Sequence, residues 1–417
     1  MRNWIIALLM PLTAVNDNRT RQKERAFVQE DFSFARWQLN GLLREADARP
    51  SRFPRTIDSG GRVTSTDSHD WTSGFFPGCL WYVYEYTSDT ALKEAAIRWT
   101  EKLAPIQYDT DTHDLGFMMY CSYGNAYRLT GNPAYKKILV QAARSLCTRF
   151  NPITGTIRSW NSFTSWHGSK TYDFPVIIDN MMNLELLFFA YRVTGDTMFR
   201  HVALSHAEMT LRYQIRPDHS CYHVVCYDQE TGKVLARETA QGYADNSTWS
   251  RGQAWGIYGF TVAYRETRDT RFLSEAMKMA DYFIDNKNLP SDQVPFWDFN
   301  ANADGFLPGV RSNAFRRQYD TRDVSAAAVV ASALFELGAY CGGAQDSVYI
   351  REAVQILHTL SGPAYRAAPG RNGNFLLMHS VGSIPHGVDI DVPLIYADYY
   401  FMEALLRYDR RLKASNR

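Results

Sequence analysis

The 417-residue sequence lacks the motifs that mark common cofactor sites and disulfide scaffolds. Its six cysteines form no CxxC pair, and the chain is long enough to bury a core without covalent cross-links, so we expect mostly buried thiols. A P-loop, a GxGxxG after a strand and a GxSxG elbow are all absent, which argues against the usual nucleotide, dinucleotide and serine-hydrolase sites. No Gly/Ser-rich or Pro-rich linker divides the chain, and we therefore predict one domain.

The chain also lacks an excess of charge of either sign. With 45 basic and 44 acidic residues its formal net charge is +1, so no whole-molecule field would attract nucleic acid or an anionic membrane. Any anion must be bound locally. Aromatic residues make up 14% of the chain and include 10 tryptophans, more than a core usually needs, and stacking on sugar rings would explain the excess.

The longest apolar run, from Trp4 to Val15, is too short to span a bilayer. It follows a basic start and ends in small residues near Ala14, a pattern typical of a secretion signal. We predict that residues 1–23 are a signal or disordered segment and that residues 24–417 form the folded domain. We also predict that the protein is exported to the periplasm. A misassigned start and a cytoplasmic protein are the alternatives.

One pattern recurs along the chain and predicts helical hairpins. A tyrosine stands three residues before a threonine, Asp or Asn follows two residues after that threonine, and a large apolar residue comes three further on. This order ends one helix, makes a tight turn with a side-chain cap, and starts another helix. The four copies occupy residues 84–92, 127–135, 191–199 and 264–272, with a degenerate fifth from Tyr340 to Tyr349.

The irregular spacing of these hairpins favours a closed ring over a solenoid. Helices expected near 30–46 and 393–407 would pair as a sixth hairpin, which predicts an all-α fold of the (α/α)6-barrel type. A single β-hairpin is expected near 221–238, where two β-rich runs flank a Gln-Glu-Thr-Gly turn.

Polar segments stand 15 to 20 residues before each turn, where the inner helices should begin. In a closed ring all six starts face one end of the barrel, so these segments should converge. Five carry aspartate and one carries Arg251. The segments are 68–78, 112–117, 174–180, 248–255, 319–325 and 387–393.

Two of these aspartates are candidates for chemistry. Asp114 follows His113, and Asp179 follows an apolar run that should place it deep in the cavity. Burial and a neighbouring carboxylate could keep one of them protonated at neutral pH, as a general acid requires. The competing interpretation is a helix cap or a brace that holds a loop, which we favour for Asp320, Asp323, Asp389 and Asp391.

Arg251 and Trp255 lie four residues apart and therefore share a helix face. A planar guanidinium suits a carboxylate and an indole ring suits a sugar face, so the pair indicates an acidic carbohydrate. The alternative is an aromatic core helix with a surface arginine. His219 and His223 are also four apart but lack a third ligand, so we expect no metal site and no cofactor.

The sequence resembles the unsaturated glucuronyl hydrolases of glycoside hydrolase family 88 from about Asp67 to Asp409. The motifs that carry the resemblance are Trp71-Thr-Ser-Gly-Phe, His113-Asp114-Leu-Gly-Phe, Ile178-Asp179-Asn180-Met-Met-Asn and Ser250-Arg251-Gly-Gln-Ala-Trp255. The resemblance implies that Asp179 is the general acid and base and that Asp114 assists it. It further implies a sugar site lined by Trp71, His223, Thr239, Gln241, Arg251 and Trp255.

The substrate that the resemblance implies is an oligosaccharide made by a polysaccharide lyase, of the glycosaminoglycan type, with an unsaturated uronate at its non-reducing end. One group that gives and accepts protons would protonate the double bond at C4, and water would add at C5. We expect the enzyme to be a monomer or a weak oligomer. Two alternatives remain open. One is an unsaturated rhamnogalacturonyl hydrolase acting on pectin fragments, and the other is a sugar-binding protein without catalysis, against which the two aspartates argue.

Overall fold

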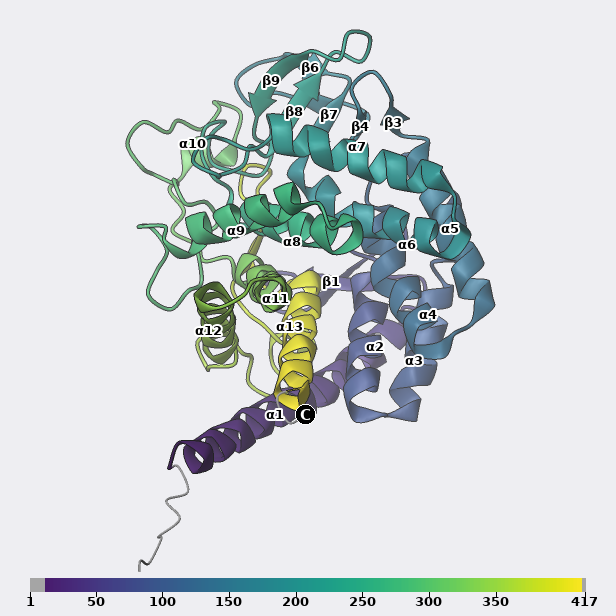
Figure 1. The fold of residues 1–417 in the computed structure, drawn as a ribbon, viewed down its shortest axis with the longest axis vertical. Helices are drawn as coiled ribbons and strands as arrows, with labels where there is room; N and C mark the ends of the chain where they lie inside the picture. Colours follow the sequence, from purple (N-terminus) through teal and green to yellow (C-terminus); the bar gives the residue numbers. More distant parts are fainter. Residues whose placement is uncertain (1–11, 415–417) are drawn as a thin grey trace, which may run out of the picture.

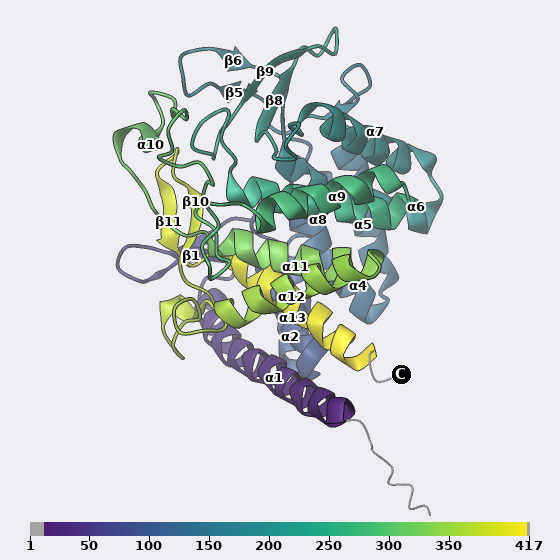
Figure 2. The same cartoon turned by 60° about the vertical axis from the view of Figure 1, so that its left-hand side comes forward.

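A computed structural model describes residues 12–414, and within them helical hairpins form a ring with small β-structures at one end (Figures 1 and 2). Five hairpins pair an inner helix with an outer one. They are α2 (Phe75–Thr87) with α3 (Thr90–Glu101), α4 (Asn125–Thr130) with α5 (Pro133–Cys147), α6 (Leu184–Thr194) with α7 (Thr197–Tyr213), α8 (Ser250–Thr267) with α9 (Thr270–Ile284), and α11 (Val324–Tyr340) with α12 (Ala344–Leu360).

The repeated turn works as the sequence predicts. In each of the first four hairpins a residue in the left-handed region ends the inner helix, and the next residue accepts a hydrogen bond from an amide of the following helix. The accepting side chains belong to Asp89, Asn132, Asp196 and Asp269. At the degenerate fifth turn Gly343 precedes the outer helix and supplies no side-chain cap.

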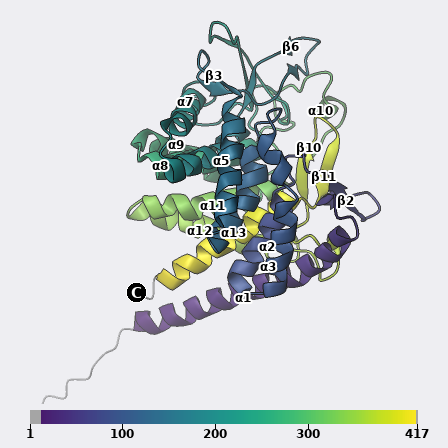
Figure 3. The ribbon, with the colours of Figure 1, turned by 90° about the vertical axis from the view of Figure 1, so that its right-hand side faces the viewer.

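The first and last helices close the ring. Helix α13 (Ile395–Ala414) packs between α11 and α2, and α1 (Leu12–Asp47) packs across α13 and α2. Figure 3 shows α1 running alongside α13 on the outside of the molecule. The predicted all-α barrel of six hairpins is confirmed, with an outer helix longer than expected.

Two inner helices begin irregularly, and both carry a candidate aspartate. The segment η2 (Gly116–Gly124) is a π-helix that runs into α4, and η3 (Ile178–Asn183) is a 3-10 helix that runs into α6. They pack closely, because a Cβ on Gly116 would lie 2.4 Å from the Cα of Asn183. Glycine at 116 therefore permits the contact that brings the two helix starts together.

The β-structure exceeds the expected hairpin. Strands β8 (Val224–Tyr227) and β9 (Val234–Glu238) confirm it, and β7 (Pro175–Ile177) adds a third antiparallel strand that leads directly into η3. Four two-stranded ribbons cover the same end of the barrel. They are β1 (Phe53–Ile57) with β2 (Val63–Thr66), β3 (Phe150–Asn151) with β4 (Thr156–Ile157), β5 (Phe163–Thr164) with β6 (Thr171–Tyr172), and β10 (Ser380–Ser383) with β11 (Val388–Val392). Short helical segments complete the chain: η1 (Ala104–Tyr108), α10 (Asn313–Arg316) and η4 (Asn372–Asn374).

The predicted signal or disordered segment, residues 1–23, lies only partly within the described residues. Residues 1–11 lie outside them, while residues 12–23 form the first turns of α1 rather than an irregular segment. Between residues 12 and 414 no helix is long and apolar enough to cross a membrane. All six cysteines are unpaired and four of them are buried, as expected.

Candidate active site

Asp179 lies on the wall of a small inner pocket of about 70 Å³ at the strand-covered end of the barrel. Strand β7 leads to the first turn of η3, where Asp179 is 8% exposed. Burial raises the pKa of Asp179 to about 7; Arg251 opposes the rise and the charge of Asp114 adds to it. The carboxyl group therefore holds a proton for much of the time near neutral pH.

Asp114 lines the same inner pocket from the start of η2. Burial raises its pKa to about 7, while Thr112 and Asn183 lower it by hydrogen bonding. Thr112 and Asp114 bond each other, since the Thr112 hydroxyl donates to the carboxylate at 3.3 Å and accepts from the Asp114 amide at 3.0 Å. The convergence of the two aspartates, predicted from their places at inner-helix starts, is therefore what the structure shows.

Each aspartate faces one buried histidine. Nε2 of His113 lies 3.4 Å from Asp114, and Nε2 of His223 lies 3.6 Å from Asp179. Burial lowers the pKa of His113 to about 3 and that of His223 well below its usual value, so both rings are neutral. Nδ1 of His223 accepts hydrogen bonds from the amides of Ala240 and Gln241, both at 3.0 Å. Its proton must then sit on Nε2, directed at Asp179.

Trp255 differs from the expected role as a sugar platform. It is fully buried, with its ring 5.2 Å from Phe117 and 5.4 Å from Tyr400. Its indole N–H lowers the pKa of Asp179, although Nε1 makes no hydrogen bond with any described residue. Trp255 thus packs behind the inner pocket and presents a donor, while its ring face is covered by the core.

Arg251 also differs from expectation, because its planar fork is already occupied. The guanidinium is 1% exposed; Nη1 donates to Asp323 at 2.8 Å and to the Val381 carbonyl, and Nη2 donates to the Gly382 carbonyl at 2.6 Å. Only Nε lacks a partner among the described residues. Arg251 therefore ties α8 to α11 and to β10, and it places a positive charge on the pocket wall.

The inner pocket adjoins an outer cavity of about 620 Å³, and Trp71, Trp160 and Gln241 line both. Trp71 is half-buried against Phe117 and Tyr396, which leaves part of its ring facing the cavities. The two predicted residues Trp71 and Gln241 therefore face both cavities. No aspartate or glutamate lines the outer cavity within the described chain.

Thr239 has a structural task in the same loop. Its hydroxyl accepts from the Gly242 amide at 2.8 Å, and its own amide donates to Asp245 at 2.9 Å. It is 5% exposed and does not line the inner pocket or the outer cavity. The predicted contact of Thr239 with sugar thus has no support in the position of its side chain.

The four aspartates predicted to cap helices or hold loops make such contacts. Asp323 caps α11 and pairs with Arg251, and Asp389 pairs with Arg55 at 2.8 Å. Asp391 bonds His379 at 2.6 Å, and Asp320 accepts from Asn302. Across residues 12–414 no three His, Cys, Asp or Glu side chains are grouped so as to hold a metal ion.

Sequence reasoning missed several residues of the cavities. Trp160, Trp166 and Phe163 reach the outer cavity from the β4–β6 region, and Arg311 reaches it from the loop before α10. Strands of two residues leave no periodicity to detect, so the only signal was the high tryptophan count. His113 was noticed beside Asp114 but was not assigned to the site.

A barrel of helical hairpins with two protonatable acids at one end, opening into a cavity with aromatic walls, is the arrangement of a glycoside hydrolase. The family model for Glycosyl Hydrolase Family 88 matches residues 44–286, and the chain belongs to that family. It is 39% identical to an unsaturated glucuronyl hydrolase of Formosa agariphila, over 96% of this chain and 97% of that protein. It is 31% identical to an unsaturated chondroitin disaccharide hydrolase of Streptococcus pyogenes, over 95% and 97%.

Solved structures agree with the assignment. A crystal structure of an unsaturated glucuronyl hydrolase specific for heparin superposes with a TM-score of 0.82 at 43% identity, covering 92% of this chain and 98% of that one. The unsaturated glucuronyl hydrolase of Bacillus sp. GL1, described as responsible for glycosaminoglycan degradation, gives a TM-score of 0.81 at 30% identity, with coverages of 91% and 97%.

Proposed function

We propose that the enzyme removes the unsaturated uronate from the non-reducing end of glycosaminoglycan-type oligosaccharides produced by lyases. The observation that carries the proposal is the protonatable Asp179 in a small inner pocket beside a larger cavity with aromatic walls. The inner pocket would take the reacting bond, and the outer cavity would take the rest of the oligosaccharide. Similarity to unsaturated glucuronyl and chondroitin disaccharide hydrolases supports the substrate class.

The chemistry follows from the substrate. The ring oxygen makes the C4=C5 bond a vinyl ether, so protonation at C4 leaves an oxocarbenium ion at C5. Asp179 gives this proton, then accepts one from the water that adds to C5, and so returns to its starting state. The C5 hemiketal opens to a ketone, which exposes a C1 hemiacetal that expels the partner sugar. The distance rule for retaining and inverting carboxylate pairs does not apply, since one acid serves both steps.

The surroundings of Asp179 suit this cycle. Nε2 of His223 lies 3.6 Å from its carboxyl group and Trp255 lowers its pKa, so both favour the carboxylate after the proton has left, although neither makes a hydrogen bond with it in the described chain. Arg251 lies on the same pocket wall and, although paired with Asp323, its charge still lowers the pKa of Asp179. Because its outer nitrogens hold Asp323 and the β10 carbonyls and its Nε is buried, we propose that Arg251 attracts the uronate by charge, instead of by the two-nitrogen fork expected from the sequence.

The outer cavity suits an acidic or sulfated partner sugar. Arg311 reaches it and donates to the Gly168 carbonyl, but has no acidic partner among the described residues. Arg55, in contrast, is neutralised by Asp70 and Asp389. A related enzyme has been solved with an unsaturated disaccharide carrying a sulfated N-acetylgalactosamine. A surplus of positive charge without acids favours an acidic or sulfated partner sugar over the neutral rhamnose that adjoins the unsaturated uronate in a pectin fragment.

The test is the loss of the enoate ultraviolet band on a panel of unsaturated disaccharides. The proposal expects turnover of heparin- or chondroitin-derived compounds, with little on the rhamnogalacturonan-derived one. Arg311→Gln should weaken turnover of sulfated more than of unsulfated disaccharides, and Arg316→Gln, in the nearby helix α10 but outside the cavity lining, serves as the matched control. Preference for the pectin fragment would establish the rhamnogalacturonyl alternative, and binding without band loss would establish a sugar-binding protein.

We further propose that the protein is exported and acts as a monomer or weak oligomer. The basic start and the short apolar run support export. N-terminal sequencing of the protein secreted by its host would find the chain starting beyond residue 15, whereas an intact N-terminus in the cytoplasm would contradict export. Light scattering at several concentrations tests the assembly state.

A further inference from the structure

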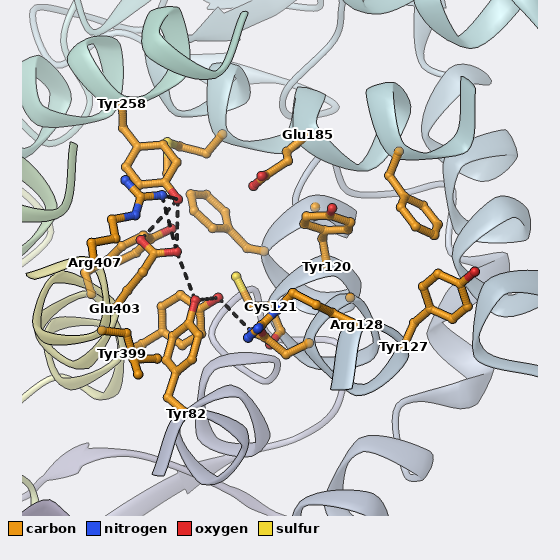
Figure 4. A pocket seen from close by; sticks show the side chains of 18 of the residues that line it. Tyr82, Tyr120, Cys121, Tyr127, Arg128, Glu185, Tyr258, Tyr399, Glu403 and Arg407 are labelled. Carbon is orange, nitrogen blue, oxygen red and sulfur yellow. Dashed lines mark hydrogen bonds and ion pairs between the residues drawn. The ribbon is translucent and has the colours of Figure 1, made fainter. Parts of the chain in front are cut away.

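A second cavity of about 400 Å³ opens at the opposite end of the barrel, where the inner helices end (Figure 4). Its walls come from α2, η2, α4, η3, α6, α8 and α13. Phe117 lines both this rear cavity and the inner catalytic pocket, so one aromatic layer separates them. The volume falls in the range of roughly 300–1,000 Å³ that small-molecule sites occupy.

The charged groups around the rear cavity neutralise one another. Arg265 binds Glu185, Glu266 and Glu336 with its three nitrogens, which leaves no fork for an anion. Arg407 binds Glu336 and Glu403 and also donates to a carbonyl and a tyrosine hydroxyl. At the mouth, the more exposed arginines are paired as well: Arg128 and Arg410 with Glu85, and Arg192 with Glu266.

Free hydrogen-bonding capacity in the rear cavity belongs to tyrosine hydroxyls. Tyr400 is 2% exposed and lines the cavity, yet its hydroxyl has no hydrogen-bond partner among the described residues. The hydroxyls of Tyr120 and Tyr127, on neighbouring turns of η2 and α4, are likewise without a protein partner there. The rings of both pack against Phe189 at 5.6 Å. None of the three hydroxyls is among the fully buried side-chain atoms without a partner, so they face the cavity and are free to bond water or a bound molecule there.

Other tyrosines show that the cavity wall is otherwise satisfied. Tyr82 and Tyr258 donate to Glu403, and Tyr82 also bonds the hydroxyl of Tyr399 at 2.8 Å (Figure 4). The unpartnered hydroxyls therefore stand out against a complete network. Figure 4 shows Glu185 on the same cavity wall as Tyr120, and its hydrogen bonding engages only one carboxylate oxygen.

We propose that the rear cavity binds a neutral sugar. Aromatic rings offer stacking surfaces, the tyrosine hydroxyls and the free oxygen of Glu185 offer hydrogen bonds, and the neutralised arginines disfavour an anion. A purely apolar ligand would leave the free hydroxyls unsatisfied. The site is separate from the catalytic pocket, and it does not depend on which oligosaccharide the enzyme hydrolyses.

The test is a titration of the full chain with D-glucose and N-acetyl-D-glucosamine, with D-glucuronate as the anionic comparison, followed by saturation-transfer NMR. Saturable binding of the neutral sugars is expected, with weaker binding of glucuronate. Tyr400→Phe and Tyr120→Phe should each weaken neutral-sugar binding about threefold to tenfold, the effect of one lost hydrogen bond. Because these hydroxyls have no protein partner, both variants should fold normally.

Two controls locate the binding. Tyr123→Phe removes a buried, unpartnered hydroxyl on the same π-helix that does not line the rear cavity, and it should leave affinity unchanged. Trp71→Ala alters the outer catalytic cavity and should also leave it unchanged. The proposal is overturned by absence of saturable binding, by tighter binding of glucuronate, by loss of binding in Trp71→Ala, or by unchanged affinity in both Tyr400→Phe and Tyr120→Phe.

Discussion

At the scale of single residues, the environment of Asp179 decides the chemistry. An ordinary aspartate ionises near pH 4 and would be unable to protonate a carbon at neutral pH. Burial in the inner pocket moves its pKa to about 7, whereas Arg251 and Trp255 keep the shift from going further. The group can thus give a proton and take one back at the same pH.

Replacing Asp179 by asparagine should abolish this cycle without disturbing the fold. Asparagine keeps the shape of the side chain but cannot titrate, so turnover should fall by about a hundredfold or more. Band loss under single-turnover conditions measures the effect. A folded Asp179→Asn enzyme with near-normal turnover would remove Asp179 from the mechanism.

The pH profile tests whether the two aspartates interact. Asp179 must be protonated to act, so activity should fall as pH rises through its pKa of about 7. The charge of Asp114 raises that pKa, and Asp114→Asn should therefore move the alkaline limb to lower pH as well as slow the enzyme. A slower variant with an unmoved limb would show that Asp114 only positions substrate or water.

The sequence predicted the residues whose position follows from local signals. Asp114 and Asp179 could be found because each stands at the start of an inner helix, and ring closure then brings such starts together. The hydrogen bonds that occupy the guanidinium of Arg251 could not be predicted, since its partners Asp323, Val381 and Gly382 lie 72 to 131 residues away in the sequence. The position of Trp160 in the cavity wall could not be predicted, because the short strands around it have no periodic sequence pattern.

At the scale of secondary-structure elements, the contact between η2 and η3 sets the geometry of the site. The Phe117 amide donates to the Asn183 side chain at 3.0 Å, and Gly116 lets the two backbones approach. This contact positions both aspartates, because each precedes or begins one of these irregular helices. The irregularity itself was not predicted, since it arises from packing between the two segments.

A methyl group at Gly116 should force these helices apart. Gly116→Ala should destabilise the protein by about 1–3 kcal/mol, as overpacking of a core does, and lower turnover as well. Gly131→Ala serves as a stability comparison, because its strain lies in a left-handed turn with open space around it. Denaturant unfolding and band loss measure both effects. Unchanged turnover in Gly116→Ala would show that the contact does not control the aspartates.

The hairpin turns make a separate prediction about stability. Asp196 caps α7 by accepting from the Met198 amide at 3.0 Å, on the outer surface of the barrel. Asp196→Ala should cost about 1 kcal/mol and leave turnover unchanged. The exposed Asp304, which makes no such bond, is the matched control, and Asp304→Ala should change little. Equal unfolding free energies for the two variants would mean that this cap contributes nothing.

At the scale of the whole molecule, ring closure converts a repeated local pattern into one site. Because the sequence repeats the turn rather than the whole hairpin, the ring could be predicted while the ribbons over its mouth could not. Those ribbons build the outer cavity and hold the buried Arg251, so they set what the site accepts. The opposite end of the same ring holds the rear cavity.

The central claim is that the reaction is a hydration of the C4=C5 bond and not direct cleavage at C1. The most direct measurement uses an unsaturated glucuronyl compound whose C1 is joined to its aglycone through carbon, so that no bond to the aglycone can break. If the reaction is a hydration, the enzyme still removes the enoate band of this compound and the Asp179→Asn variant does not. If the compound binds the enzyme but keeps its enoate absorption, while the natural disaccharide is turned over, hydration of the C4=C5 bond is not the reaction.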